Sequence, residues 1–81
     1  MPTFHLRVQL ADRPGALGLV ASRIGSVGAD IVAIEILERV DGTVIDEFIL
    51  QLPSAELVEL LRSEVHEVDG VRIERLNELP D

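Results

Sequence analysis

Apolar and polar residues alternate strictly at the start of the chain. The apolar positions are Phe4, Leu6, Val8 and Leu10, and the residues between them are polar. This period of two is typical of a strand with one buried face, because successive side chains of a strand point to opposite faces. The pattern predicts a β-strand over Thr3–Leu10.

From Asp12 to Asp30 the spacing changes to that of an amphipathic helix. Apolar residues recur there every three or four positions, so one face of the helix is apolar. Pro14 suits the first helical position, and Asp12 stands ahead of it, where a carboxylate accepts hydrogen bonds from free N–H groups. Gly28 and Ala29 mark the end of the helix. The apolar face consists of Leu17, Val20, Ala21, Ile24, Val27 and Gly28.

Two strand-like runs follow, Ile31–Val40 and Thr43–Leu52, with the strong hairpin signal Asp41-Gly42 between them. A two-residue loop mixes polar and apolar residues on both faces of this hairpin. A three-residue loop, Asp41–Thr43, gathers the apolar residues on one face, and we favour it because a shift of one residue turns every side chain over. The residues on that face are then Val32, Ile34, Ile36, Phe48, Leu50 and Leu52, and an apolar patch on the opposite face contains Ala33, Leu37, Ile45 and Ile49.

The remaining third of the chain predicts a second helix and a fourth strand. Ser54 is placed to cap the helix, whose apolar stripe is formed by Leu57, Val58, Leu61 and Val65. Asp69-Gly70 forms a turn into a short strand over Val71–Leu76. The polar segment Asn77–Asp81 is expected to be a frayed tail.

The resulting order, β-α-β-β-α-β, predicts the ferredoxin-like fold of the α+β class. Both crossovers are right-handed, so the two helices cover one face of a four-stranded antiparallel sheet. The first and third strands lie in the middle of this sheet, and the second and fourth form its edges. With 81 residues and no internal linker, residues 1–81 are expected to be a single domain with its core over 3–76.

Composition narrows the classes of function. The net charge of −8 repels nucleic acid, and two Phe are the only aromatic residues that could stack on bases. The apolar runs are too short to span a membrane, and the first residues lack the pattern of a signal peptide, so a cytoplasmic protein is expected. Without cysteine, a domain this small has no disulfide to stabilise it, which favours association into at least a homodimer.

No catalytic or metal-binding set of residues emerges from the sequence. His5 and His66 are far apart and have no ligand partners at metal spacing, so both are expected to be solvated surface residues. The few hydroxyl residues have no acid–base partners at a repeated spacing, and there is no cysteine nucleophile or glycine-rich phosphate loop. We therefore expect a protein that is not an enzyme and that needs no metal or cofactor.

A row of small residues on the first helix has two interpretations. Gly18, Ser22, Gly25 and Ala29 lie three to four positions apart. Glycine inside a helix costs about 1 kcal/mol relative to alanine, so two of them require a reason. Either another subunit's helix approaches closely, or the row fits tightly against the second helix of the same chain.

Four short segments together resemble the ACT domain, a small βαββαβ module that binds amino acids and regulates metabolic enzymes. They are the turn Asp12–Leu17, the segment Gly28–Ile31, Asp46–Phe48 and Asp69–Val71. Each motif is short, but their order and spacing cover nearly the whole chain. Serine-binding members carry Asn where this chain has Asp12 and Asp30, so the resemblance does not imply serine as the ligand.

The resemblance implies a ligand site beside the turn after the first strand, at an interface between two such domains. Gly15 would let the backbone approach the ligand, whose carboxylate suits the free N–H groups at a helix start. Asp12 or Asp30 would take the ammonium group. The implied site residues are Asp12, Arg13, Pro14, Gly15, Ala16, Leu17, Asp30 and Ile31. For Asp12 and Asp30, a purely structural role in capping a turn remains open.

Two functions remain in view from the sequence. The first is a non-catalytic regulatory module that binds a small amino acid between subunits and modulates a metabolic enzyme. The second is a ligand-free assembly subunit of the same fold that mediates oligomerisation or contact with an enzyme.

Overall fold

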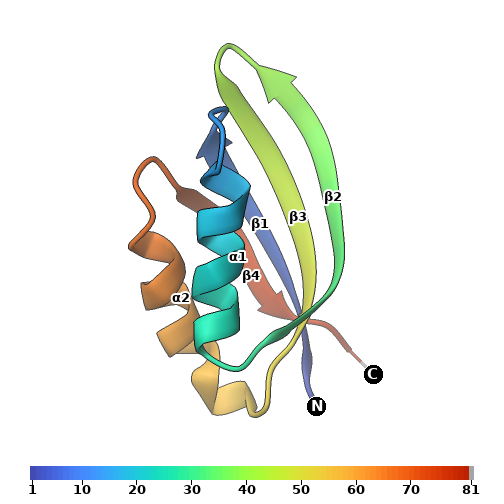
Figure 1. Cartoon of the computed structure of the whole chain (residues 1–81). Coiled ribbons are helices and arrows are strands. Elements are labelled where there is room, and N and C mark those ends of the chain that lie inside the picture. Colours follow the sequence, from blue (N-terminus) through green and yellow to red (C-terminus); the bar gives the residue numbers. More distant parts are fainter. Residues whose placement is uncertain (81) are drawn as a thin grey trace.

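Four strands form one antiparallel sheet in the order β2-β3-β1-β4, and two helices lie on one of its faces (Figure 1). The structure is a computed structural model and describes residues 1–80. The predicted ferredoxin-like α+β fold is confirmed, including the central and edge positions of the strands. The elements are β1 (Thr3–Ala11), α1 (Ala16–Ser26), β2 (Asp30–Val40), β3 (Thr43–Gln51), the 3₁₀ turn η1 (Ala55–Leu57), α2 (Val58–His66) and β4 (Arg72–Glu78).

The core lies between the sheet and the helices and is aliphatic apart from Phe4 and Phe48. The alternation predicted for β1 appears as alternating buried and half-buried positions. Ser54 caps the 3₁₀ turn η1 that leads into α2, since its Oγ accepts a hydrogen bond from the N–H of Glu56 at 3.3 Å, whereas α2 itself has no side-chain cap. The helices contribute Val20, Ile24, Leu61 and Val65 to this core, all with no exposed surface.

The β2–β3 hairpin has a two-residue loop, so the predicted three-residue loop is wrong. Val40 pairs with Thr43, and the loop residues Asp41 and Gly42 have φ of 49° and 80°. Positive φ at both loop positions is the geometry of a type I′ turn, which matches the twist of the flanking strands.

Two register shifts in β2 explain why the apolar residues still share a face. They lie between Ile31 and Ala33 and between Ile36 and Glu38. Each shift is a bulge that places one extra residue in β2. Ile34 consequently lies opposite Phe48, on the helix side of the sheet. The prediction assumed that the two strands pair without interruption. It therefore assigned a third residue to the loop, whereas the structure has extra residues in β2.

The C-terminal segment is more ordered than predicted. β4 continues to Glu78, with Asn77 opposite His5, and the N–H of Leu79 donates to the carbonyl of Thr3 at 2.8 Å. The expected frayed tail is therefore wrong over residues 77–79, because β1 is long enough to pair with them. Asp81, the last residue of that tail, lies outside the described residues.

The large exposed apolar residues of the sheet all lie on β2. Of the patch predicted on the helix-free face, Ala33 and Leu37 on β2 are exposed, whereas Ile45 and Ile49 on β3 are half-buried beside Gln9 and His5. β2 curves away from α1 at its far end (Figure 1). No helix covers its outer residues, which we call the β2 stripe: Val32, Ile34, Ile36, Leu37 and Val40, each 39–56% exposed. None of the helices in residues 1–80 is long and apolar enough to cross a membrane.

Candidate functional site

The turn between β1 and α1 differs in detail from the sequence prediction. The N–H of Ala16 donates to the carbonyl of Arg13 at 3.2 Å, and Gly15 has φ 84° and ψ −10°. Proline followed by glycine with this geometry is typical of a type II turn. α1 therefore begins at Ala16, two residues later than the predicted start at Pro14, and Asp12 does not cap it, since the helix has no side-chain cap.

Three backbone donors remain free at this start of α1. Within residues 1–80, the N–H groups of Gly15, Leu17 and Gly18 have no hydrogen-bond acceptor, whereas that of Leu19 donates to the carbonyl of Gly15 at 3.0 Å. Free N–H groups at the positive end of a helix attract anionic groups. Free donors are therefore present at this turn, although the N–H of Ala16, which was expected to be one of them, donates to Arg13 instead.

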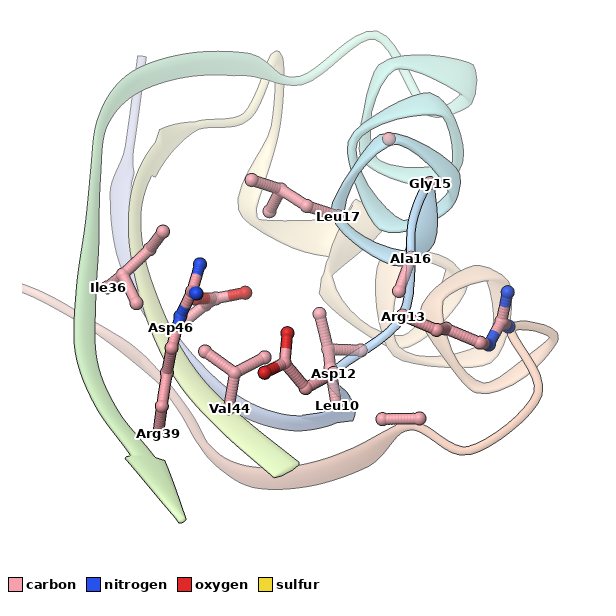
Figure 2. A pocket seen from close by; sticks show the side chains of 12 residues that line it. Leu10, Asp12, Arg13, Gly15, Ala16, Leu17, Ile36, Arg39, Val44 and Asp46 are labelled. Atoms are coloured by element: carbon pink, nitrogen blue, oxygen red, sulfur yellow. The ribbon is translucent and has the colours of Figure 1, made fainter. Parts of the chain in front are cut away.

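These donors border a cavity of about 150 Å³ between the start of α1 and the β2–β3 hairpin. The N–H of Asp12 donates to the carbonyl of Gly42 at 2.8 Å, which ties the turn to the hairpin at this end of the sheet. Figure 2 shows the labelled side chains arranged around this space. The lining residues are Leu10, Ala11, Asp12, Arg13, Gly15, Ala16, Leu17, Gly18, Ile36, Arg39, Val44 and Asp46.

Five of the eight predicted site residues line the cavity, and three do not. Asp12, Arg13, Gly15, Ala16 and Leu17 form its wall, whereas Pro14 lies exposed in the turn. The remaining two, Asp30 and Ile31, lie at the other end of β2, paired with Gln51 and Leu50. Within one chain, the structure does not bring them to the turn.

Asp46 is the site residue that sequence reasoning missed. It is 1% exposed, and its Oδ1 has no hydrogen-bond partner within residues 1–80. Burial raises the pKa of the Asp46 carboxyl; the positive charge of Arg39 opposes this rise in pKa, and the negative charge of Asp12 adds to it. The sequence did contain a signal for this residue. Every second residue of β3 is buried, and all of these are apolar except Asp46, which stands between Val44 and Phe48 in that series. A charged residue at a core position is typical of function rather than of packing.

The two arginines of the cavity wall behave differently. Arg13 points away from the cavity in Figure 2, and its Nη2 donates to the carbonyl of Asp69 at 3.4 Å, which tethers the turn to the loop before β4. Arg39, from β2, extends beside Asp46 in the same view, and it takes part in no salt bridge within the described part of the chain. Its guanidinium is therefore available to a negatively charged group in the cavity.

Comparison with solved structures decides the fold family. No protein-family model matches the chain, and no curated protein matches it. The ACT domain of the GTP pyrophosphokinase of Chlorobium tepidum superposes with a TM-score of 0.73 at 16% identity, over 98% of this chain and 100% of that one. The chain has the fold of an ACT domain.

Two further structures share this ACT fold within longer chains. One is an unknown protein from Galdieria sulphuraria, with a TM-score of 0.84 at 15% identity over 99% of this chain and 46% of that one. The other is a formyltetrahydrofolate deformylase from Pseudomonas putida KT2440, with a TM-score of 0.78 at 15% identity over 96% of this chain and 29% of that one. This chain thus spans less than half of the length of either, and the likeness extends to the fold alone.

Within this ACT fold, the glycines of α1 are not packed against the second helix. A Cβ atom added to Gly18 or to Gly25 meets no atom within 4 Å. The interpretation that the row of small residues fits tightly against α2 is therefore wrong for these two positions. α1 and α2 are instead joined by Arg23 Nη1 and Glu64 Oε1 at 3.3 Å.

The histidines do not form a metal site. Residues 1–80 contain no group of three or more His, Cys, Asp or Glu side chains that could hold a metal ion. His66 is exposed as predicted, but His5 is not a solvated residue, because its Nε2 lies 2.8 Å from Glu47 Oε2 on the helix-free face. Arg7 extends this cluster, with its Nε 2.9 Å from Glu74 Oε1.

Proposed function

We propose that this chain is a non-catalytic regulatory module that binds a small amino acid at the β1–α1 turn and modulates a metabolic enzyme. The observation that carries the proposal is the cavity at this turn, bordered by the free N–H groups of Gly15, Leu17 and Gly18. These donors suit the carboxylate that every amino acid shares. The ACT fold, which also occurs in a formyltetrahydrofolate deformylase, supports a partnership with an enzyme.

The dimensions of the cavity fit a small ligand. Its volume of about 150 Å³ equals that of an engineered protein cavity known to bind benzene, a molecule about the size of alanine or serine. Gly15 and Gly18 leave open space at the wall, since a Cβ atom at either position meets nothing within 4 Å. The aliphatic residues Leu10, Leu17 and Val44 offer contact to a short apolar side chain.

A second copy of the chain would complete this site. β2 is an edge strand whose outer backbone groups are unpaired, and two such edges can pair antiparallel around a two-fold axis. Such pairing places the start of one β2 beside the end of the other. Asp30 of the partner subunit would then approach Arg39 and the cavity, which gives Asp30 and Ile31 the role that they lack within one chain.

Calorimetric titration with the proteinogenic L-amino acids tests the proposal, with Gly18→Leu and Gly25→Leu as a matched pair. Both glycines lie in α1 with open space around them, but only Gly18 lines the cavity. We expect the wild type to bind at least one amino acid at millimolar concentration or below. Gly18→Leu should abolish this binding by filling the cavity, and Gly25→Leu should retain it. Absence of binding to the wild type would contradict the proposal.

The second candidate, a ligand-free assembly subunit, is favoured by one observation. The β2 stripe exposes five apolar residues along one edge strand, and exposed apolar surface of this kind is typical of a protein interface. Titration separates the two candidates, because an assembly subunit oligomerises without binding any amino acid.

A further inference from the structure

Asp46 carries a cost that the fold itself does not explain. It is the one buried charged residue among residues 1–80, and its Oδ1 lacks a hydrogen-bond partner. Burying a polar group without a partner is unfavourable, and an apolar residue would suit this position, since Val44 and Phe48 on the same face of β3 are apolar and buried. The carboxylate borders the cavity, and Figure 2 shows it directed into that space.

We propose that Asp46 binds the ammonium group of the ligand and thereby selects amino acids that have a free amino group. This inference rests on the proposed function, because it names the group on this chain that recognises the amino acid. A ligand ammonium supplies the hydrogen-bond donor that Oδ1 lacks, and a charge-assisted bond of this kind is stronger than a neutral one.

The charges around the cavity orient the ligand. Asp46 on β3 and Asp12 on the turn form an acidic side, and Figure 2 shows both carboxylates facing the same space. The free N–H groups of Leu17 and Gly18, at the start of α1, form the side that attracts an anion, whereas the guanidinium of Arg39 lies beside Asp46. A zwitterionic ligand therefore places its ammonium near Asp46 and its carboxylate near the start of α1.

Binding at Asp46 is coupled to its proton. Burial and the negative charge of Asp12 raise the pKa of Asp46, while Arg39 on β2 opposes the rise. Its neighbours in the sheet, Val8 on β1 and Ile36 on β2, carry no charge. An ammonium group favours the charged carboxylate, so the ligand displaces the proton when Asp46 holds one. Affinity consequently falls as the pH is lowered through the raised pKa.

The test compares the wild type with Asp46→Asn and Glu67→Gln by calorimetry. Both substitutions remove one negative charge and keep the side-chain shape, but Glu67 is exposed at the end of α2 and does not line the cavity. The probes are the proteinogenic L-amino acids, their N-acetyl derivatives, which lack the ammonium, and the corresponding primary amines, which lack the carboxylate. Circular dichroism establishes that each variant is folded.

We expect Asp46→Asn to weaken amino-acid binding by about ten- to a hundredfold, the effect of losing one charge-assisted hydrogen bond. Glu67→Gln should leave binding unchanged, and the N-acetyl derivatives should fail to bind the wild type. The affinity of the wild type should fall as the pH is lowered through the raised pKa of Asp46, and this fall should be smaller in Asp46→Asn.

Failure of this inference differs from failure of the proposed function. If an amino acid binds the wild type and Asp46→Asn with equal affinity, Asp46 is not the ammonium site, while the proposed function stands. If the wild type binds an amino acid and its N-acetyl derivative with equal affinity, Asp46 is likewise not the ammonium site. If only the primary amines bind, and do so through Asp46, the amino-acid function fails and the role of Asp46 stands. Binding of no probe overturns both.

Discussion

A single side chain, Asp46, is unfavourable for stability at the position where we propose that it recognises the ligand. Its carboxylate is buried beside the aliphatic core with one oxygen unpaired. We predict that Asp46→Val raises the free energy of unfolding by about 1 kcal/mol, since an unsatisfied buried polar group costs about 1–3 kcal/mol. Urea unfolding of the two proteins at neutral pH measures the difference. A loss of stability would show that the carboxylate has a structural partner.

The same prediction has a defined pH dependence. The folded state holds the Asp46 proton more tightly than the unfolded state, because burial raises the pKa above its ordinary value of 3.8. As the pH rises from 3.8 through the raised pKa, the unfolded state loses its proton first, and the stability of the wild type falls. The advantage of Asp46→Val should therefore be largest at neutral pH and shrink as the pH is lowered from the raised pKa to about 3.8. If the stability difference between Asp46→Val and the wild type grew as the pH was lowered, burial would not be raising the pKa of Asp46.

The position of the turn after β1 was predicted from local sequence signals, and that turn borders the cavity. The predicted helix start at Pro14 was wrong, because Gly15 adopts a positive φ and α1 begins only at Ala16. Asp46 and Arg39 were not predicted, because they reach the cavity through strand pairing rather than through sequence neighbourhood. Their placement depends on the register of the β2–β3 hairpin, which the loop prediction had wrong.

At the scale of elements, the hairpin β2–β3 shows what periodicity predicts and what it does not. The existence and order of all the strands and helices followed from the alternation and from the helical spacing. The pattern also predicted that the apolar residues of both strands lie on the helix side of the sheet, and Ile34 does lie there, opposite Phe48. The two bulges in β2 were not predictable, since a run of Ile, Val, Ala and Leu pairs equally well with one residue displaced.

The geometry of the two-residue loop leads to a specific prediction about Gly42. Its φ of 80° is unfavourable for any residue with a Cβ atom, so Gly42→Ala should lower the free energy of unfolding by about 1 kcal/mol. Asp41→Asn is the matched control, because Asn tolerates the positive φ of this position, and it should leave stability unchanged. Thermal unfolding of the three proteins measures both effects. Equal stability of Gly42→Ala and the wild type would favour a different loop.

The whole molecule presents the features of a protomer rather than of an isolated domain. It has 81 residues and no cysteine, so its core is small and has no disulfide. The stripe of exposed aliphatic residues runs along β2, the strand whose outer edge is unpaired. Natural edge strands are usually protected by charges or proline, and β2 has neither over Ile31–Ile34.

We therefore predict that the protein is at least a dimer and that β2 forms the contact. Ile34→Lys should shift the protein toward the monomer, because a two-fold axis at the middle of β2 brings both lysines into the contact, where they lose hydration and repel each other. Leu60→Lys is the control: Leu60 on α2 is 50% exposed, close to the 44% of Ile34, but lies off the strand edge. Light scattering coupled to size-exclusion chromatography at micromolar concentration distinguishes the states.

The outcome of that measurement also bears on the ligand site. If the wild type is a dimer and Ile34→Lys is a folded monomer, amino-acid binding should weaken in the monomer, because Asp30 of the partner subunit no longer reaches the cavity. Retention of full affinity by the monomer would assign binding to one chain alone, with Asp12 and Asp46 sufficient for the ammonium. A wild type that is monomeric at micromolar concentration would remove β2 as an interface and leave its exposed aliphatic stripe to a different partner.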